Sequence, residues 1–251
     1  MPGAATPEPI SPVPPGLSGR PIMHQRWVDV AFLHWRIDPA RVAPLLPPGT
    51  TPDVYDGDSW VGLIPFRMVG AGIASGPAVP WLGTFAETNV RLYSVDRGGR
   101  RGVVFRSLDA SRLGVVIGAR VTFGLRYCWA KMRVRATGAD LEYTTVRRRW
   151  PGGRGVSSRA VVRPGAALST SDPLADFLTA RWGLHTRWAG RSVFVPNEHE
   201  RWPLHSATLQ HLEEDQVAAA GLPGVTTRPP DSVLWSPGVT ARFGMPLLDR
   251  R

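Results

Sequence analysis

The residues best suited to chemistry lie in residues 85–93, which read Phe-Ala-Glu-Thr-Asn-Val-Arg-Leu-Tyr. In an extended strand alternate side chains share a face, so Glu87, Asn89 and Arg91 point one way while the residues between them point the other. On a solvent-facing strand such groups are simply hydrated. Inside a protein they need partners, because an isolated buried charge is costly, and together they would form a site for a small polar group.

Two later segments add candidate residues to this strand. Residues 102–109 carry apolar or small residues on both faces, which favours a strand covered on both sides, as in a closed barrel. Residues 119–127 have the pattern of another strand and include an arginine and a tyrosine. We therefore expect the three segments to surround one internal cavity.

A catalytic interpretation assigns three residues to general acid/base chemistry on a small carbonyl or acidic metabolite. Glu87 is the expected base, with a pKa raised by burial. Tyr127 is the expected proton donor or oxyanion partner, and Arg120, or Arg91 in its place, would hold a carboxylate through the planar guanidinium. Isomerisation, dehydration, cyclisation and carbon–carbon lysis all remain compatible with this set.

A second interpretation is a non-catalytic protein that binds an apolar or aromatic ligand. The chain has ten tryptophans, some of which could line a cavity, although most tryptophans in any protein belong to the core. Six side chains are expected to contact the ligand: Asn89, Arg91, Ser107, Phe105, Trp129 and Trp35.

Composition excludes several other classes. The 251-residue chain has a net charge of +10, but its basic residues are scattered and Lys131 is the only lysine, so a nucleic-acid-binding module is not expected. No stretch approaches the length of a membrane span. The single cysteine, Cys128, rules out an internal disulfide and, with no signal peptide visible, predicts a cytoplasmic protein.

Cofactor motifs are also missing from the sequence. It has no dinucleotide-binding glycine loop, no phosphate-binding loop, no nucleophile elbow and no zinc spacing. His205 and His211 are six residues apart, which fits no common ligand pair. We expect no cofactor and no metal, and a small molecule as the partner; homo-oligomerisation is left open.

The element pattern predicts a mainly β protein. Residues 1–21 contain seven prolines and are expected to form a disordered tail, and residues 22–251 are expected to form one domain. About ten strands are predicted, with helices at 39–45, 174–182 and 213–220 and a weaker helical pattern at 110–117. The glycine-rich apolar residues 70–81 could be a flap over the cavity or a loop on the core.

Several motifs together resemble the DUF2071 family, also called YqjF-like. They are Trp27 to Trp35, the Leu-Leu-Pro-Pro-Gly of residues 45–49, the segments 85–93 and 102–109, and the Trp-Pro-Leu of residues 202–204. The resemblance extends from about residue 22 to 248. Members of this family are similar in fold to acetoacetate decarboxylase, so the resemblance implies a closed antiparallel β-barrel with an internal ligand cavity.

The resemblance stops at the reacting residues of acetoacetate decarboxylase. In that enzyme a lysine forms a Schiff base with the keto acid, and an adjacent lysine lowers its pKa. Here Tyr127 and Cys128 stand where the similar segment would place the lysine pair, and Lys131 lies about 13 Å further along the strand. We therefore do not expect Schiff-base decarboxylation.

Overall fold

The computed structural model describes residues 6–150, 153, 155–169, 172–188 and 190–248. Within these residues thirteen strands form one continuous sheet, so the mainly β class is confirmed. The strands are β1 (Met23–Ile37), β2 (Thr50–Pro52), β3 (Ser59–Ile73), β4 (Phe85–Asp96), β5 (Arg101–Ala110), β6 (Tyr127–Thr137), β7 (Asp140–Arg147), β8 (Ser157–Ala167), β9 (Gly183–Trp188), β10 (Arg191–His199), β11 (His205–Glu214), β12 (Ser232–Phe243) and β13 (Leu247–Leu248).

Short helices connect the strands. They are α1 (Pro39–Val42), η1 (Ala43–Leu45), α2 (Leu113–Phe123), α3 (Pro173–Thr179), α4 (Gln216–Ala219) and η2 (Val225–Thr227). The carboxylates of Asp38 and Asp172 accept backbone N–H bonds at the starts of α1 and α3, and each is followed by proline at the first helical position. A capping carboxylate followed by proline at the first helical position stabilises the start of a helix.

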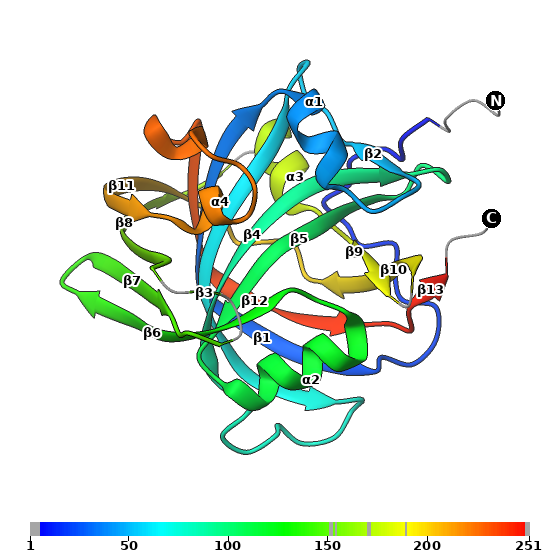
Figure 1. Cartoon of the computed structure of the whole chain (residues 1–251), viewed down its shortest axis with the longest axis horizontal. Helices are drawn as coiled ribbons and strands as arrows, with labels where there is room; N and C mark the ends of the chain where they lie inside the picture. The colour runs from blue at the N-terminus through cyan, green and yellow to red at the C-terminus, as the bar shows by residue number, and fades with distance from the viewer. Residues whose placement is uncertain (1–5, 151–152, 154, 170–171, 189, 249–251) are drawn as a thin grey trace.

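The sheet closes on itself along two routes (Figure 1). One ring of nine hydrogen-bonded strands runs β5-β6-β7-β8-β11-β12-β1-β3-β4 and returns to β5. A second route joins β5 to β12 through β9 and β10. The strands β12, β1, β3, β4 and β5 therefore belong to both rings. Both faces of β4 are covered by protein, and none of its residues is exposed.

Side chains on the two faces of β1 enter different apolar cores. Leu33 and Trp35 pack into a filled core on the side of β6, β7, β8 and α4. Phe32 and Val30 face a second core. Between Val28 and Leu33 the pairing of β1 with β3 shifts register, and the backbone of Asp29 has a φ of 51°. This bulge changes which residues of β1 share a face.

The helix α2 differs from the sequence prediction. Residues 119–127 have a strand pattern, but the structure continues α2 to Phe123, ends it at Gly124 with a φ of 63°, and begins β6 at Tyr127. Its β-branched residues favour a strand locally. The helix nevertheless forms because Val116 is fully buried against the second core and a left-handed glycine ends the helix.

Helix α2 and the loop at residues 74–84 lie together at one end of the molecule (Figure 1). The Arg112 side chain donates a hydrogen bond to the carbonyl of Trp81 at 3.2 Å. A side chain added at Gly114 would meet Leu82 at 3.0 Å. This loop and helix therefore cover the second core at this end.

The N-terminal segment also differs from the expected disordered tail. From residue 6 onward it lies along the sheet: the amide of Glu8 donates to the carbonyl of Gly99 at 2.8 Å, and the indole of Trp182 donates to the carbonyl of Ser11 at 2.9 Å. Prolines restrict this segment to extended conformations, which leaves its remaining polar backbone groups free to pair. Residues 1–5 lie outside the described residues. Among the described helices, none is long and apolar enough to cross a membrane.

A buried ion pair joins the strands of the nine-stranded ring. The Asp109 carboxylate is fully buried and accepts bonds from Arg147 at 2.8 and 2.9 Å and from Gln216 at 2.8 Å. These contacts link β5 to β7 and α4. Removing one partner would leave an uncompensated charge in the interior.

We therefore expect Arg147→Leu to lower the free energy of unfolding by about 3–5 kcal/mol in urea denaturation. The double variant Arg147→Leu/Asp109→Leu should recover much of this loss, because the lone carboxylate is gone. The control Arg163→Leu breaks an exposed pair with Asp140 and should cost far less stability than Arg147→Leu. Equal losses for the buried and exposed pairs would contradict this role of Arg147.

Candidate active site

An internal cavity of about 430 Å³ lies in the second core. It is bounded by β1, β3, β4, β5, β9 and β10, and is closed at one end by α2 and the loop at residues 74–84. Its walls are mainly apolar and aromatic, with the large rings of Trp27, Phe32, Phe66, Phe85, Phe105 and Trp202. A cavity of this size and character can enclose a small organic molecule.

The polar row of β4 faces this cavity. Glu87, Asn89 and Arg91 all line it, while Val90 and Leu92 pack into the filled core on the other side. The alternation expected from residues 85–93 is therefore present. Because β4 is covered on both faces, its polar row faces the interior of the protein.

Glu87 and Tyr127 form a pair in the cavity wall. The Tyr127 hydroxyl donates to Oε2 of Glu87 at 3.1 Å, and Glu87 is 3% exposed. Burial raises the pKa of Glu87 to about 8, against the lowering effect of the Tyr127 bond and with a further contribution from the charge of Asp109. Glu87 is therefore mostly protonated at neutral pH. Since Oε2 accepts the Tyr127 bond, Oε1 is left to carry the proton.

Arg91 occupies the opposite end of the polar row from Glu87. Its guanidinium donates to the Tyr93 hydroxyl at 3.0 Å and to the carbonyl of Leu178 at 2.9 Å. It also lies over the Phe32 ring, with Cζ 5.6 Å from the ring centroid. Its described partners are thus neutral groups.

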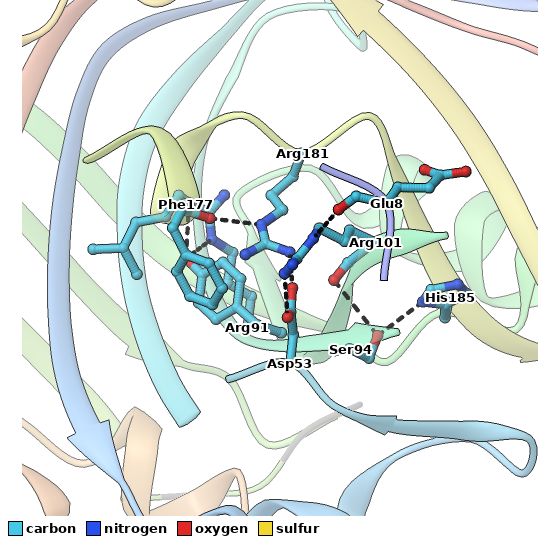
Figure 2. A network of polar contacts seen from close by, with 11 residues as sticks. Glu8, Asp53, Arg91, Ser94, Arg101, Phe177, Arg181 and His185 are labelled. Carbon is cyan, nitrogen blue, oxygen red and sulfur yellow. Dashed lines mark hydrogen bonds and ion pairs between the residues drawn. The ribbon is translucent and has the colours of Figure 1, made fainter. Parts of the chain in front are cut away.

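A second arginine reaches the cavity from the segment after α3. Arg181 donates to the carbonyl of Phe177 at 2.7 Å and forms an ion pair with Asp53. Asp53 also pairs with Arg101, and Figure 2 shows the two guanidinium groups converging on this one carboxylate. Burial lowers the pKa of Arg181, while Asp53 opposes that effect. Asp53 therefore compensates the charge of Arg181 from outside the cavity.

Several polar atoms of the wall lack a hydrogen-bond partner among the described residues. They are Arg181 Nη2, Asn89 Oδ1, Asn197 Oδ1 and Trp27 Nε1. Buried polar atoms in folded proteins are nearly always satisfied by protein or water, so each unmatched atom is a place where a bound molecule can interact. The cavity thus offers both donors and acceptors to a guest.

His199 completes the wall between aromatic side chains. Its ring lies 4.6 Å from that of Trp182 and 5.1 Å from that of Trp202, and its Nδ1 pairs with the carbonyl of Glu200 at 2.7 Å. Burial lowers the pKa of His199, so it is neutral at physiological pH. Among the described residues, no group of three or more His, Cys, Asp and Glu side chains is placed to hold a metal.

Two residues expected at the site lie elsewhere. Arg120 is on α2, and its guanidinium donates to the backbone carbonyl of Tyr127 and does not line the cavity. The prediction that Arg120 faces the cavity depends on the strand pattern of residues 119–127. Because residues 119–123 of this segment are helical in the structure, Arg120 points elsewhere. Trp35 lies on the opposite face of β1, in the filled core, with its indole bonded to the carbonyl of Arg228 at 3.0 Å.

Ser107 and Trp129, also expected to contact the ligand, do not line the cavity. The pairing of β5 with β4 shifts register between Phe105 and Ser107, so Phe105 lines the cavity while Ser107 pairs with Val90, which faces the filled core. Trp129 does not line the cavity, and the Arg148 guanidinium lies 4.4 Å from its ring centroid.

The structure adds residues that the sequence did not reveal: Arg181, Asn197, His199 and Trp202. None belongs to a recognisable catalytic motif. Arg181 is separated from its partner Asp53 by 128 residues, so only the folded chain shows that the two groups meet. The one available signal is the Trp-Pro-Leu motif that begins at Trp202.

A closed sheet around such a cavity places the chain in the class of acetoacetate decarboxylase-like folds. An acetoacetate decarboxylase-like enzyme from Sphingomonas wittichii RW1 is similar with a TM-score of 0.63 and 14% identity, over 92% of this chain and 94% of that chain. Acetoacetate decarboxylase from Legionella pneumophila gives 0.59 and 14%, over 96% and 92%. The enduracididine biosynthesis enzyme MppR, complexed with the condensation product of pyruvate and imidazole 4-carboxaldehyde, gives 0.60 and 15%, over 93% and 91%.

Sequence similarity then defines the family. Residues 24–240 match DUF2071, described as an uncharacterized conserved protein. The protein YqjF of Bacillus subtilis (strain 168) is 32% identical over 191 residues, which cover 75% of this chain and 77% of that protein. The chain belongs to the DUF2071 family.

The raised pKa of Glu87 predicts a pH-dependent stability. Between its ordinary value of 4.5 and its folded value of about 8, the unfolded chain has released the proton that the folded chain keeps. Wild-type stability should therefore fall by about 1.4 kcal/mol per pH unit across this window through Glu87 alone. Glu87→Gln lacks this effect, so its stability relative to wild type should increase up to pH 8 and then level off.

Urea denaturation at pH 5, 6, 7 and 8 measures this difference. The exposed Glu213→Gln variant is the control and should closely follow the wild-type curve at every pH. Parallel curves for Glu87→Gln and wild type would show that Glu87 titrates normally.

Proposed function

We propose that this protein is an enzyme that acts on a small molecule with a carbonyl or acidic group by general acid/base chemistry at Glu87. The observation that carries this proposal is a carboxyl group buried in the wall of a cavity, with a pKa of about 8 and a hydrogen bond to Tyr127. A catalytic acid or base works best when its pKa lies near the working pH. A carboxyl group with no catalytic or binding task would gain nothing from this costly burial.

The roles of the neighbouring residues follow from their chemistry. Protonated Glu87 can donate its Oε1 proton to a substrate oxygen, and its ionised form can accept a proton from a carbon next to a carbonyl group. Burial keeps the pKa of Tyr127 well above its ordinary value, so its hydroxyl remains a donor. The side-chain oxygen of Asn89 has no described partner, lies on the same strand face and can orient the reacting group.

Chemistry without a Schiff base is part of this proposal. Lys131 is exposed on β6 and does not line the cavity. The site therefore has no lysine amine to attack a carbonyl carbon, among the residues that the structure describes. Proton transfer of the lyase, dehydratase, isomerase or cyclase type fits the groups that are present.

The alternative is a binding protein that encloses an apolar ligand without changing it. The aromatic walls formed by Trp27, Phe32 and Trp202 favour this second function. It requires only the cavity and assigns no task to the proton of Glu87. The two functions therefore differ in what a neutral amide at residue 87 would do.

Deuterium exchange distinguishes the two functions and requires no identified product. A carbonyl compound that raises the melting temperature in a metabolite screen is incubated with the protein in D2O, and exchange of its C–H bonds is followed by NMR. Glu87→Gln should keep ligand affinity but slow exchange by about 10²–10⁴-fold. The wild-type rate should rise with pH toward 8, because the base form of Glu87 accumulates over that range.

The exposed Glu213→Gln variant should exchange at the wild-type rate. Tyr127→Phe should exchange at a reduced rate and with a higher apparent pKa for Glu87, because the phenol hydrogen bond that stabilises the ionised carboxylate is lost while the burial remains. Equal exchange by wild type and Glu87→Gln, or none with any bound carbonyl compound, would favour the binding protein.

A further inference from the structure

The charged groups at and behind the part of the cavity wall formed by Arg91 and Arg181 carry more positive than negative charge. In the contact network of Figure 2, the guanidinium groups of Arg91, Arg101 and Arg181 are accompanied by one ion-paired carboxylate, that of Asp53. Asp53 uses Oδ1 for Arg101 and Oδ2 for Arg181. Arg91 contacts only neutral acceptors among the described residues. Arg91 is partly buried, and withdrawing a cation from water without a counter-ion is costly, so an anion from outside would be stabilised here.

One donor at this place is also unused. Arg181 is 4% exposed and lines the cavity, and its Nη2 has no hydrogen-bond partner among the described residues. Arginine binds carboxylates through its planar array of N–H donors. Arg181 and Arg91 together therefore offer both the charge and the donors that a carboxylate needs.

The distance from this end to Glu87 sets the length of the guest. Glu87 and Arg91 are four residues apart on β4, so their Cα atoms lie about 13 Å apart along the strand. With C–C bonds of about 1.5 Å, a four-carbon keto acid measures less than about 5 Å between its end carbons, which is much shorter than this separation. An extended eight-carbon chain of about 9 Å spans the gap with a hydrogen bond of about 2.9 Å at each end.

We propose that Arg91 and Arg181 form a carboxylate subsite, and that the substrate is an elongated monocarboxylate of about eight carbons or more whose reacting group lies far from its carboxylate. The position of the reacting group rests on the proposed function of Glu87, whereas carboxylate binding does not. The apolar rings of Phe32 and Phe105 line the cavity beside Arg91.

Binding of simple probes tests the subsite directly. Calorimetry with butanoate, hexanoate and octanoate should show affinity rising about fourfold per added CH2, which is about 0.8 kcal/mol each. Octanamide has the same chain without the charge and should bind at least about tenfold more weakly than octanoate. Butanoate binding as tightly as octanoate would overturn the length argument, and octanamide binding as tightly as octanoate would overturn the carboxylate subsite.

Variants locate the subsite. Arg91→Gln should weaken octanoate binding at least about tenfold while leaving octanamide binding unchanged, which also shows that the variant is folded. Arg181→Lys keeps the charge near Asp53 but loses the planar donors, and should weaken octanoate binding as well. Arg135→Gln removes an exposed arginine of β6 and should change nothing. Unchanged octanoate binding by both Arg91→Gln and Arg181→Lys would place the anion elsewhere and overturn the proposal.

The subsite and the proposed catalysis fail independently. Glu87→Gln should bind octanoate like wild type, because Glu87 lies at the other end of the chain. If binding affinity depends on chain length and charge but no deuterium exchange occurs, the carboxylate subsite is supported and the proposed enzymatic function is contradicted. Exchange that requires Glu87, with no preference for octanoate over butanoate, would retain the enzyme and contradict the subsite.

Discussion

The properties of the candidate site depend on the burial of the Glu87 carboxyl group inside a closed sheet. Strand β4 belongs to both rings of strands, so neither of its faces is open to solvent. Its row of Glu87, Asn89 and Arg91 consequently lines the cavity, and the carboxyl group keeps its proton to a pKa of about 8. The same burial that makes this residue costly for the fold makes it useful for proton transfer near neutral pH.

The protein stabilises its other buried charges by pairing them across distant segments. Asp53 holds Arg101 and Arg181 from outside the cavity, and Asp109 holds Arg147 on the opposite face of the sheet. Several polar atoms that are left unmatched lie on the cavity wall instead. The paired charges thus stabilise the fold, while the residues with unmatched polar atoms line the cavity where a ligand would bind.

The sequence predicted the mainly β fold, and it predicted that Glu87, Asn89 and Arg91 share one face, because strict alternation in residues 85–93 depends only on local geometry. It misplaced residues wherever alternation is interrupted. The bulge near Asp29 puts Trp27 on the same face as Phe32, and the register shift after Phe105 turns Ser107 away from the cavity. Arg120 was misplaced because tertiary packing makes a β-branched segment helical. Long-range partners such as Asp53 and Arg181 leave no local signal at all.

Carbon-13 NMR titration of the Glu87 side-chain carboxyl group is the most direct test of this account. The resonance, assigned by its loss in Glu87→Gln, should shift with an apparent pKa of about 8. Titration near the ordinary value of 4.5 would mean that the carboxyl group is hydrated and ionised at neutral pH, which would contradict both its burial in the cavity wall and its proposed role as the proton donor and acceptor.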